Sequence, residues 1–239
     1  MQIDVIMLIS GLSPKALKQR ELTLQKQSST GTDIRLVLTR NAPKSVESFA
    51  EMELAAPGIL ERAVESEKEG ADAVIIWGGH DPSVESTREL VSIPVLGPGG
   101  ASMYLASMLA RKFALMVQLP HVIGLAEKQV RDLGLASRCI GVYSVDVPVL
   151  ELREPPAFEK VLSTAVQAVE DGADAICFGC MALNDHAESL HEKLNQDYRG
   201  VMVINPARAV IRVTEMLVNM DLSHSKRSYR KPPKEVTFI

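Results

Sequence analysis

The sequence predicts an α/β fold of two similar lobes, each a mostly parallel sheet flanked by helices, related by a pseudo-two-fold axis with a cleft between them. Two observations lead to this prediction. Residues 70–78 and 172–180 are nearly alike, since each reads Gly-Ala-Asp-Ala and continues as an apolar run that ends in a turn. Each copy is followed by a helical stretch and by a second apolar run that ends at a proline, at 93–98 and 201–206. Matched units in the same order indicate an internal repeat.

The apolar runs are continuous rather than alternating, which is typical of strands buried on both faces of a parallel sheet. In chain order, the expected strands are residues 3–8, 74–76, 93–96, 113–119, 175–178 and 202–204. Helices are expected between them, and the clearest of these segments carry apolar residues on one side and charges on the other. The expected helices are residues 57–69, 101–109, 158–170, 181–194 and 207–217. Strands that alternate with helices predict parallel pairing.

The repeat also divides the chain. We expect an N-terminal lobe at 1–112, a C-terminal lobe at 113–220 and a tail at 221–239 that is able to pack back on the N-terminal lobe. A chain of 239 residues, of which 46% are hydrophobic, is long enough to bury a core in each lobe.

Charge and composition exclude several classes of protein. The net charge of −4 at pH 7 predicts no basic patch and therefore no nucleic-acid partner. The apolar region at 98–120 is interrupted by Arg111 and Lys112, so we expect no membrane span. The chain start lacks the cationic and apolar regions of a signal peptide, and three cysteines, an odd number, argue against a disulfide framework. These features predict a cytoplasmic protein.

Ligands of parallel sheets bind beyond the carboxyl ends of the strands. If the two lobes face each other, the turns at these ends line one cleft, and Gly78 lies opposite Cys180 because the two occupy matching places in the repeat. We therefore expect the turn residues to bind a small-molecule substrate. The expected binding residues are Ser10, Gly11, Gly78, Gly79, Gln118, Gly179 and Met181.

Cys180 is the first candidate for a catalytic residue. It follows Gly179 at the end of an apolar strand and precedes the helix expected at 181–194. A thiol at a helix N-terminus has a lowered pKa, and its thiolate can remove a proton from carbon, return one, or attack as a nucleophile. Cys177 and Cys139 instead fit the ordinary role of a small buried apolar residue.

His80 is the second candidate, since imidazole titrates near neutral pH. It precedes Asp81-Pro82, which reads as a helix N-cap followed by proline at the first helical position. His80 is equally well explained as a loop residue beside this cap. Gly78 and Gly79 supply a turn whose backbone N–H groups could meet an anion at the helix start.

Several segments, in order along nearly the whole chain, resemble motifs of one protein family. Residues 42–48 and 54–60 are similar to an early helix motif, 146–152 to a central loop, and 222–227 with Tyr229 and Pro232-Pro233 to a carboxyl-terminal motif. Asp81-Pro82 and Gly179-Cys180 match the surroundings of two catalytic cysteines. This pattern resembles the aspartate/glutamate/hydantoin racemases, and within them the hydantoin and allantoin racemase branch.

The resemblance implies catalysis without a cofactor or a metal. In this family one thiol removes the proton next to a carbonyl or carboxylate, and a second thiol delivers a proton to the opposite face. Here Gly78 occupies the place of the first thiol, the turn at 9–14 differs from the usual Asn-Pro-Asn type, and Gln118 stands where a small hydroxyl residue is common. The resemblance implies a racemase or isomerase of a small cyclic amide or amino-acid-type acid, with Cys180 as one acid–base group. The other nearby titratable side chain is His80, which is our candidate for the second group. We also expect a homo-oligomer.

The glycine at position 78 leaves two alternatives open. Arylmalonate decarboxylase has a similar fold and also has a glycine at the first thiol position. A single thiol suits such a lyase, because only one face of the intermediate is protonated after CO₂ has left. The sequence outside Gly78 is nearer to the hydantoin branch. The further alternative is a non-catalytic metabolite-binding protein, and turnover of a substrate panel distinguishes the three.

Overall fold

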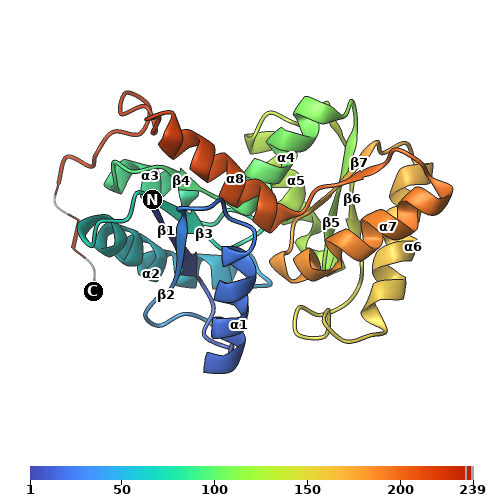
Figure 1. Ribbon diagram of the computed structural model, residues 1–239, viewed down its shortest axis with the longest axis horizontal. Helices are drawn as coiled ribbons and strands as arrows, with labels where there is room; N and C mark the ends of the chain where they lie inside the picture. Colours follow the sequence, from blue (N-terminus) through green and yellow to red (C-terminus); the bar gives the residue numbers. More distant parts are fainter. Residues whose placement is uncertain (235, 238–239) are drawn as a thin grey trace. The chain divides into compact units, whose positions relative to one another are not determined.

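The computed structural model describes residues 1–234 and 236–237, and the chain divides into two compact units. Unit 1 is Met1–Gly97 with Val210–Ile239, and unit 2 is Pro98–Ala209. Each unit contains one four-stranded sheet with helices packed around it (Figure 1).

Unit 1 is built on a parallel sheet with the strand order β2-β1-β3-β4. Its strands are β1 (Gln2–Met7), β2 (Asp33–Leu38), β3 (Ala73–Ile76) and β4 (Val95–Leu96). Its helices are α1 (Pro14–Gln25), α2 (Phe49–Lys68), α3 (Val84–Leu90) and most of α8 (Pro206–Asn219). The central strands β1 and β3 are almost completely buried, which explains their continuous apolar sequences.

Unit 2 is built on a second parallel sheet, with the strand order β6-β5-β7-β8. Its strands are β5 (Phe113–Val117), β6 (Cys139–Ser144), β7 (Ala175–Phe178) and β8 (Met202–Val203). Its α-helices are α4 (Pro98–Leu109), α5 (Ile123–Asp132), α6 (Ala157–Glu170) and α7 (Ala187–Asp197). Two 3₁₀ helices, η1 (Pro120–Val122) and η2 (Met181–His186), precede α5 and α7.

The two sheets repeat one pattern of strand pairing. In each unit, the first strand in the chain pairs with the third, and the third pairs with the fourth: β1 with β3 and β3 with β4 in unit 1, and β5 with β7 and β7 with β8 in unit 2. The residues that pair are also equivalent in the repeat: Ile6–Ile76 corresponds to Met116–Phe178, and Val74–Val95 corresponds to Ile176–Val203. Shared strand order and register confirm the predicted α/β fold of two similar lobes.

The helices α4 and α8 each follow a strand of one unit but lie wholly or mostly in the other unit. α4 follows β4 but belongs to unit 2, where the carbonyl of Ser102 accepts a hydrogen bond from Cys177 Sγ in β7 (3.7 Å). α8 follows β8, but from Val210 it belongs to unit 1, where Glu215 accepts hydrogen bonds from the backbone and hydroxyl groups of Ser29 (2.6 and 2.8 Å). The unit boundaries therefore differ from the expected ones at 112 and 220, because helix packing rather than strand order assigns these two helices.

The tail after α8 packs on α3 and β4 of unit 1. His224 Nε2 accepts a hydrogen bond from the backbone N–H of Val95 (2.5 Å), and burial, together with the charges of Arg88 and Lys226, lowers the pKa of His224 to about 4. Lys226 donates to the carbonyl of Arg88 (2.6 Å), and the guanidinium of Arg88 lies 5.3 Å from the ring centroid of Tyr229. The tail thus covers an edge strand that would otherwise be open to pairing.

Helix α2 is longer than its sequence pattern predicts. It begins at Phe49 rather than at residue 57, because its N-cap residue Ser48 and Glu51 in its first turn form hydrogen bonds like those of a capping box. Ser48 Oγ accepts a hydrogen bond from the N–H of Glu51 (3.2 Å), and the Glu51 carboxylate accepts one from the N–H of Glu47 (2.7 Å). Pro57, which we expected to open the helix, lies inside it.

Besides the short 3₁₀ helix η1, four elements have no counterpart in the sequence prediction. The strands β2 and β6 lie at sheet edges, where β2 has one buried residue and β6 is half-buried throughout, so they lack a continuous buried apolar run. α1 follows Ser13, whose Oγ accepts the N–H of Ala16 (3.2 Å), and the Ser13-Pro14 sequence is the signal that could have identified it. α5 was also missed. The edge strand β8 was predicted, but it is half-buried rather than buried on both faces.

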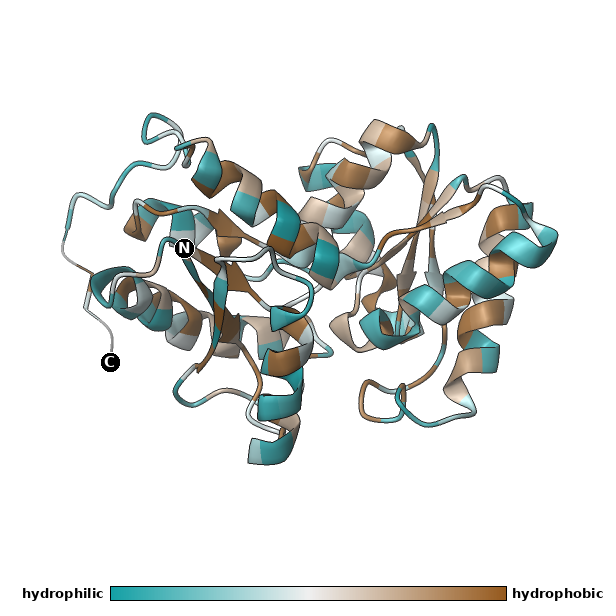
Figure 2. Cartoon of the chain, viewed as in Figure 1, coloured by the Kyte–Doolittle hydropathy of each residue, from teal (hydrophilic) through white to brown (hydrophobic). Residues whose placement is uncertain are grey.

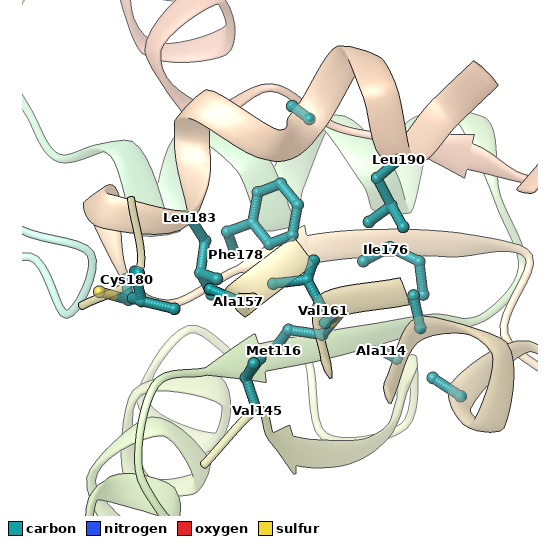
Figure 3. Packing of buried hydrophobic residues seen from close by; sticks show 14 of the residues in the cluster. Ala114, Met116, Val145, Ala157, Val161, Ile176, Phe178, Cys180, Leu183 and Leu190 are labelled. Carbon is teal, nitrogen blue, oxygen red and sulfur yellow. The ribbon is translucent and has the colours of Figure 1, made fainter. Parts of the chain in front are cut away.

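The hydrophobic core follows the strands, which are the most hydrophobic segments in Figure 2. In unit 2, alternate residues of β5 and β7 face two clusters. One cluster, drawn in Figure 3, packs α6 and α7 against Met116 and Phe178, and the other packs α4 and α5 against Leu115 and Cys177. In the part of the chain that the structure describes, no helix is both long and apolar enough to cross a membrane.

Candidate functional site

Cys180 lies just beyond the carboxyl end of β7 and is only 7% exposed. The preceding Gly179 donates its backbone N–H to the carbonyl of Met116 in β5 (2.8 Å), and a Cβ at residue 179 would lie 3.0 Å from Val117 Cγ1. A glycine at position 179 therefore permits the backbone just before Cys180 to pack closely against Val117 of β5. In Figure 3 the sulfur of Cys180 points away from the labelled side chains of the apolar cluster.

The segment after Cys180 differs from the single helix expected at 181–194. It consists of the six-residue 3₁₀ helix η2 and then α7, with Cys180 at the N-cap position of η2 and its carbonyl accepting the N–H of Leu183 (3.1 Å). A short 3₁₀ helix aligns fewer peptide dipoles than an α-helix of three or more turns. The structure thus gives weaker support to thiolate stabilisation by a helix dipole than the sequence suggested. Met181 is half-buried at the start of η2.

The other two cysteines have the environments of structural residues. Cys177 is fully buried within β7, and burial raises the pKa of its thiol. Cys139 starts β6, donates to the carbonyl of Gly141 (3.3 Å), and has its pKa raised chiefly by burial. All three cysteines lie in the described part of the chain, and none there is in a disulfide. A thiol with a raised pKa is a poor source of thiolate at neutral pH.

Gln118 lies just beyond the carboxyl end of β5 and is 2% exposed. Its backbone carbonyl accepts a hydrogen bond from the N–H of Val147 (2.9 Å), and the preceding carbonyl of Val117 accepts one from Val145 (2.9 Å). These bonds fix the backbone at the end of the strand. Its side-chain oxygen Oε1 is buried and has no hydrogen-bond partner among the residues that the structure describes.

Two asparagines at the same end of the sheet of unit 2 act as helix caps. Asn205 Oδ1 accepts the backbone N–H of Arg208 (3.0 Å), and Asn184 Oδ1 accepts that of Ala207 (3.3 Å), so both satisfy N–H groups in the first turn of α8. Asn184 is 7% exposed and was not identified from the sequence, where a polar residue four positions after Cys180 was the only signal.

In unit 1, Gly78 follows Trp77 at the carboxyl end of β3 and has almost no room for a side chain. A Cβ at this position would lie 2.7 Å from Leu8 Cδ2 and 2.8 Å from Pro82 Cδ. Trp77 is 6% exposed, and its indole Nε1 lacks a hydrogen-bond partner within the described residues. The guanidinium of Arg20 lies 6.0 Å from the Trp77 ring centroid. Arg20 is therefore a neighbour of this turn that the sequence did not reveal.

His80 is half-buried in the turn that follows Gly78. The predicted cap at Asp81 is wrong, because α3 begins at Val84 and its N-cap residue is Ser83. Asp81 instead has a left-handed backbone (φ 53°), and its N–H donates to the carbonyl of Gly78 (3.0 Å). Its carboxylate packs directly on Gly97, where a Cβ would lie 2.1 Å from Oδ1, so residue 97 must be glycine for Asp81 to occupy this position.

Ser10 and Gly11 lie in an exposed loop after β1 that is held to residues 42–44. Ser10 donates its backbone N–H to the carbonyl of Pro43 (2.9 Å) and its hydroxyl to that of Ala42 (2.9 Å). A Cβ at Gly11 would lie 2.6 Å from the carbonyl oxygen of Lys44, so a glycine is needed here too. The Ser10 hydroxyl is thus already engaged as a donor and can offer a ligand only its lone pairs.

The sequence-predicted residues thus form two groups, one in each unit. At the carboxyl ends of the strands of unit 1 lie Ser10, Gly11, Gly78, Gly79 and His80. At the corresponding ends in unit 2 lie Gln118, Gly179, Cys180 and Met181. Within the described ranges, no three His, Cys, Asp or Glu side chains gather as a metal site would require.

Comparisons with known proteins agree with the fold. Residues 17–214 match the family model described as Asp/Glu/Hydantoin racemase. A hydantoin racemase from Pseudomonas sp. is 33% identical over 221 residues, which cover 90% of this chain and 86% of that protein.

Solved structures show the same relationship. Allantoin racemase from Klebsiella pneumoniae superimposes with a TM-score of 0.89 at 29% identity, covering 98% of this chain and 94% of that one. Arylmalonate decarboxylase has a TM-score of 0.62 at 16% identity over 91% of this chain and 92% of its own, a likeness of fold alone. The family match, the identity to a curated racemase and the shared fold together establish that the chain belongs to the Asp/Glu/hydantoin racemase family.

Proposed function

We propose that this isomerase of the racemase family moves a proton at the carbon next to a carbonyl in a small cyclic amide or amino-acid-type acid, without a cofactor. The observation that carries the proposal is the placement of Cys180 beyond the end of β7, after a glycine whose close packing fixes the turn. The thiolate takes the proton from carbon and becomes a thiol, while the electron pair of the C–H bond moves onto the carbonyl oxygen as an enolate. Return of a proton to carbon regenerates the carbonyl.

Racemisation also needs a group that acts on the opposite face of the carbon. Position 78, where the resemblance implies a thiol in relatives, is a glycine whose side-chain space is occupied by Leu8 and Pro82. We propose His80 for this role, because it lies two residues further in the same turn and imidazole exchanges protons near neutral pH. Backbone and side-chain groups at the strand ends would hold the substrate. These are Ser10, Gly11, Gly78, Gly79, Gln118, Gly179 and Met181.

The proposal is tested by exchange in deuterated water with each enantiomer of a 5-substituted hydantoin, followed by chiral chromatography and mass spectrometry. The wild type should give both enantiomers, each deuterated at the reacting carbon. Cys180→Ala should abolish exchange, and His80→Asn should stop racemisation while single-face exchange by Cys180 continues. Cys139→Ala is the matched control and should retain full activity. Racemisation by the Cys180→Ala variant would exclude the thiol as the acid–base group.

A decarboxylase is the second candidate, and Gly78 is the observation that favours it. Only one proton is delivered after a malonate-type acid loses CO₂, so a single thiol is sufficient for that reaction. The test is incubation with a disubstituted malonate under the same conditions. Release of CO₂ with formation of one enantiomer, together with no exchange in any hydantoin, would favour the lyase over the racemase.

A further inference from the structure

We infer that the carboxamide of Gln118 binds the –CO–NH– edge of a ring amide and thereby selects cyclic amides over carboxylic acids as substrates. This inference rests on the proposed function, whose substrate class it narrows. The starting observation is the side-chain oxygen of Gln118, which is buried in a residue that is 2% exposed and which has no donor among the described residues. A buried acceptor that makes no hydrogen bond destabilises the folded protein, because it has lost its bonds to water. A ligand N–H would recover this energy.

The pairing of β5 with β7 places Gln118 beside Cys180. Met116 pairs with Phe178 in parallel register, and Gln118 and Cys180 each lie two residues beyond that pair, at the same end of the sheet. Backbone hydrogen bonds from Val147 and Val145 hold the chain in place at this point.

The internal repeat supports this placement independently. In unit 1 the equivalent residues are Leu8 and Gly78, since each lies two residues beyond the pair Ile6–Ile76. These two are in contact, because a Cβ on Gly78 would come within 2.7 Å of Leu8 Cδ2. By this equivalence, the side chain of Gln118 would lie toward position 180 in unit 2. Unit 1 has an apolar leucine where unit 2 has a carboxamide, so the polar group is specific to the half that contains the thiol.

The chemistry of a carboxamide matches a ring amide and not a carboxylate. Gln118 presents one acceptor and one NH₂ donor side by side. A peptide-type bond within a five- or six-membered ring is forced to be cis, so its N–H and C=O point to the same side and can form two hydrogen bonds with the carboxamide. A carboxylate has two acceptors and no donor, and it would leave Oε1 unpaired. Sites built around a substrate N–H discriminate strongly against analogues that lack it.

The experiment compares Gln118→Met with the wild type on two ligands, hydantoin and 1,3-dimethylhydantoin, by isothermal titration calorimetry. Methionine keeps the length of the side chain and removes both hydrogen-bonding groups. The wild type should bind hydantoin at least about tenfold more tightly than the dimethyl compound, and Gln118→Met should lose about tenfold in affinity for hydantoin alone. Thermal unfolding of the free variant should be unchanged or raised, because the removed oxygen has no hydrogen-bond partner among the residues that the structure describes. Gln129→Met, a buried glutamine in α5, is the control and should preserve the preference.

Several results would overturn the inference. One such result is equal affinity of the wild type for the two ligands. Another is that Gln118→Met loses the same affinity for both ligands, or loses none. Each result would show that the carboxamide does not hydrogen-bond to the ring N–H. Failure of the inference is distinct from failure of the proposed function. Selective binding of hydantoin without proton exchange would remove the racemase proposal and leave the recognition by Gln118 intact. Racemisation of hydantoins that is unaffected by Gln118→Met would support the racemase proposal and refute recognition by Gln118. Absence of both hydantoin binding and proton exchange would refute the racemase proposal and the recognition by Gln118.

Discussion

A side chain at position 78 is expected to destabilise unit 1, because the space above Gly78 is already filled. An added Cβ would lie 2.7 Å from Leu8 Cδ2, 2.8 Å from Pro82 Cδ and 3.1 Å from Pro82 Cγ. Leu8 can rotate its methyl group away, whereas the pyrrolidine ring of Pro82 is rigid. Overpacking of this kind costs about 1–3 kcal/mol, so Gly78→Ala should lower the free energy of unfolding by roughly that amount.

A thiol adds one more heavy atom at the same place, so Gly78→Cys should lose at least as much stability as Gly78→Ala. Leu8 supplies part of the obstruction, and shortening it in Leu8→Val should therefore relieve part of the strain. Residues in contact typically show coupling energies of about 0.5–3 kcal/mol. The double variant should accordingly be more stable than the sum of the two single losses predicts.

Urea unfolding of these variants, followed by circular dichroism, measures the loss. Gly124→Ala in α5 is the matched control, because a Cβ there meets no heavy atom within 4 Å apart from its chain neighbours and the backbone of its own helix. This control should be neutral or stabilising by up to about 1 kcal/mol. If Gly78→Ala unfolds at the same urea concentration as the wild type and the control, the space is open and the reasoning is refuted.

Three further predictions concern reactivity, pH and assembly. Cys180 should react with iodoacetamide at pH 8 while Cys177, whose pKa is raised by burial, stays unmodified; peptide mapping that finds equal labelling would contradict this. The free energy of unfolding should fall as the pH drops from 6.5 to about 4, because His224 takes up a proton in that range only when unfolded. Screening of this half-buried ring limits the loss to roughly 1–2 kcal/mol, and urea titrations of His224→Gln should lack this slope. Met108 is 80% exposed on the uncharged helix α4, so Met108→Glu should weaken the expected homo-oligomer in sedimentation velocity, and an unchanged profile would place the interface elsewhere.

The sequence by itself was sufficient to predict the fold class. The central strands of each sheet are buried on both faces, and such strands have continuous apolar sequences that are easily recognised. The runs 74–76 and 175–178 are apolar throughout, and the structure shows both as fully buried central strands. Their near-identical surroundings also revealed the repeat, since equivalent βα units in one chain keep equivalent turns. The edge strands β2 and β6 escaped prediction for the same physical reason, because half-buried strands need fewer apolar residues.

The sequence also identified the turns in which functional residues are expected. A thiol after a glycine at the end of a buried strand singled out Cys180, and the resemblance to a racemase family was supported by the comparisons. Sequence reasoning was less successful for local backbone conformation. Asp81-Pro82 reads as a helix start, yet Asp81 adopts a left-handed conformation and packs on Gly97, sixteen residues away in the chain.

Only the tertiary structure decided what surrounds each of these turns. The closed space at Gly78 depends on Leu8, which is seventy residues away in the chain. The side-chain oxygen of Gln118 is seen to lack a partner within the described ranges only once its burial and its neighbours are known. Helix packing likewise assigned α4 to unit 2 and most of α8 to unit 1. The physical reason is common to all these cases. Periodicity and turn residues are local properties of a chain, whereas steric exclusion, desolvation and hydrogen-bond satisfaction depend on groups that folding brings together from distant positions.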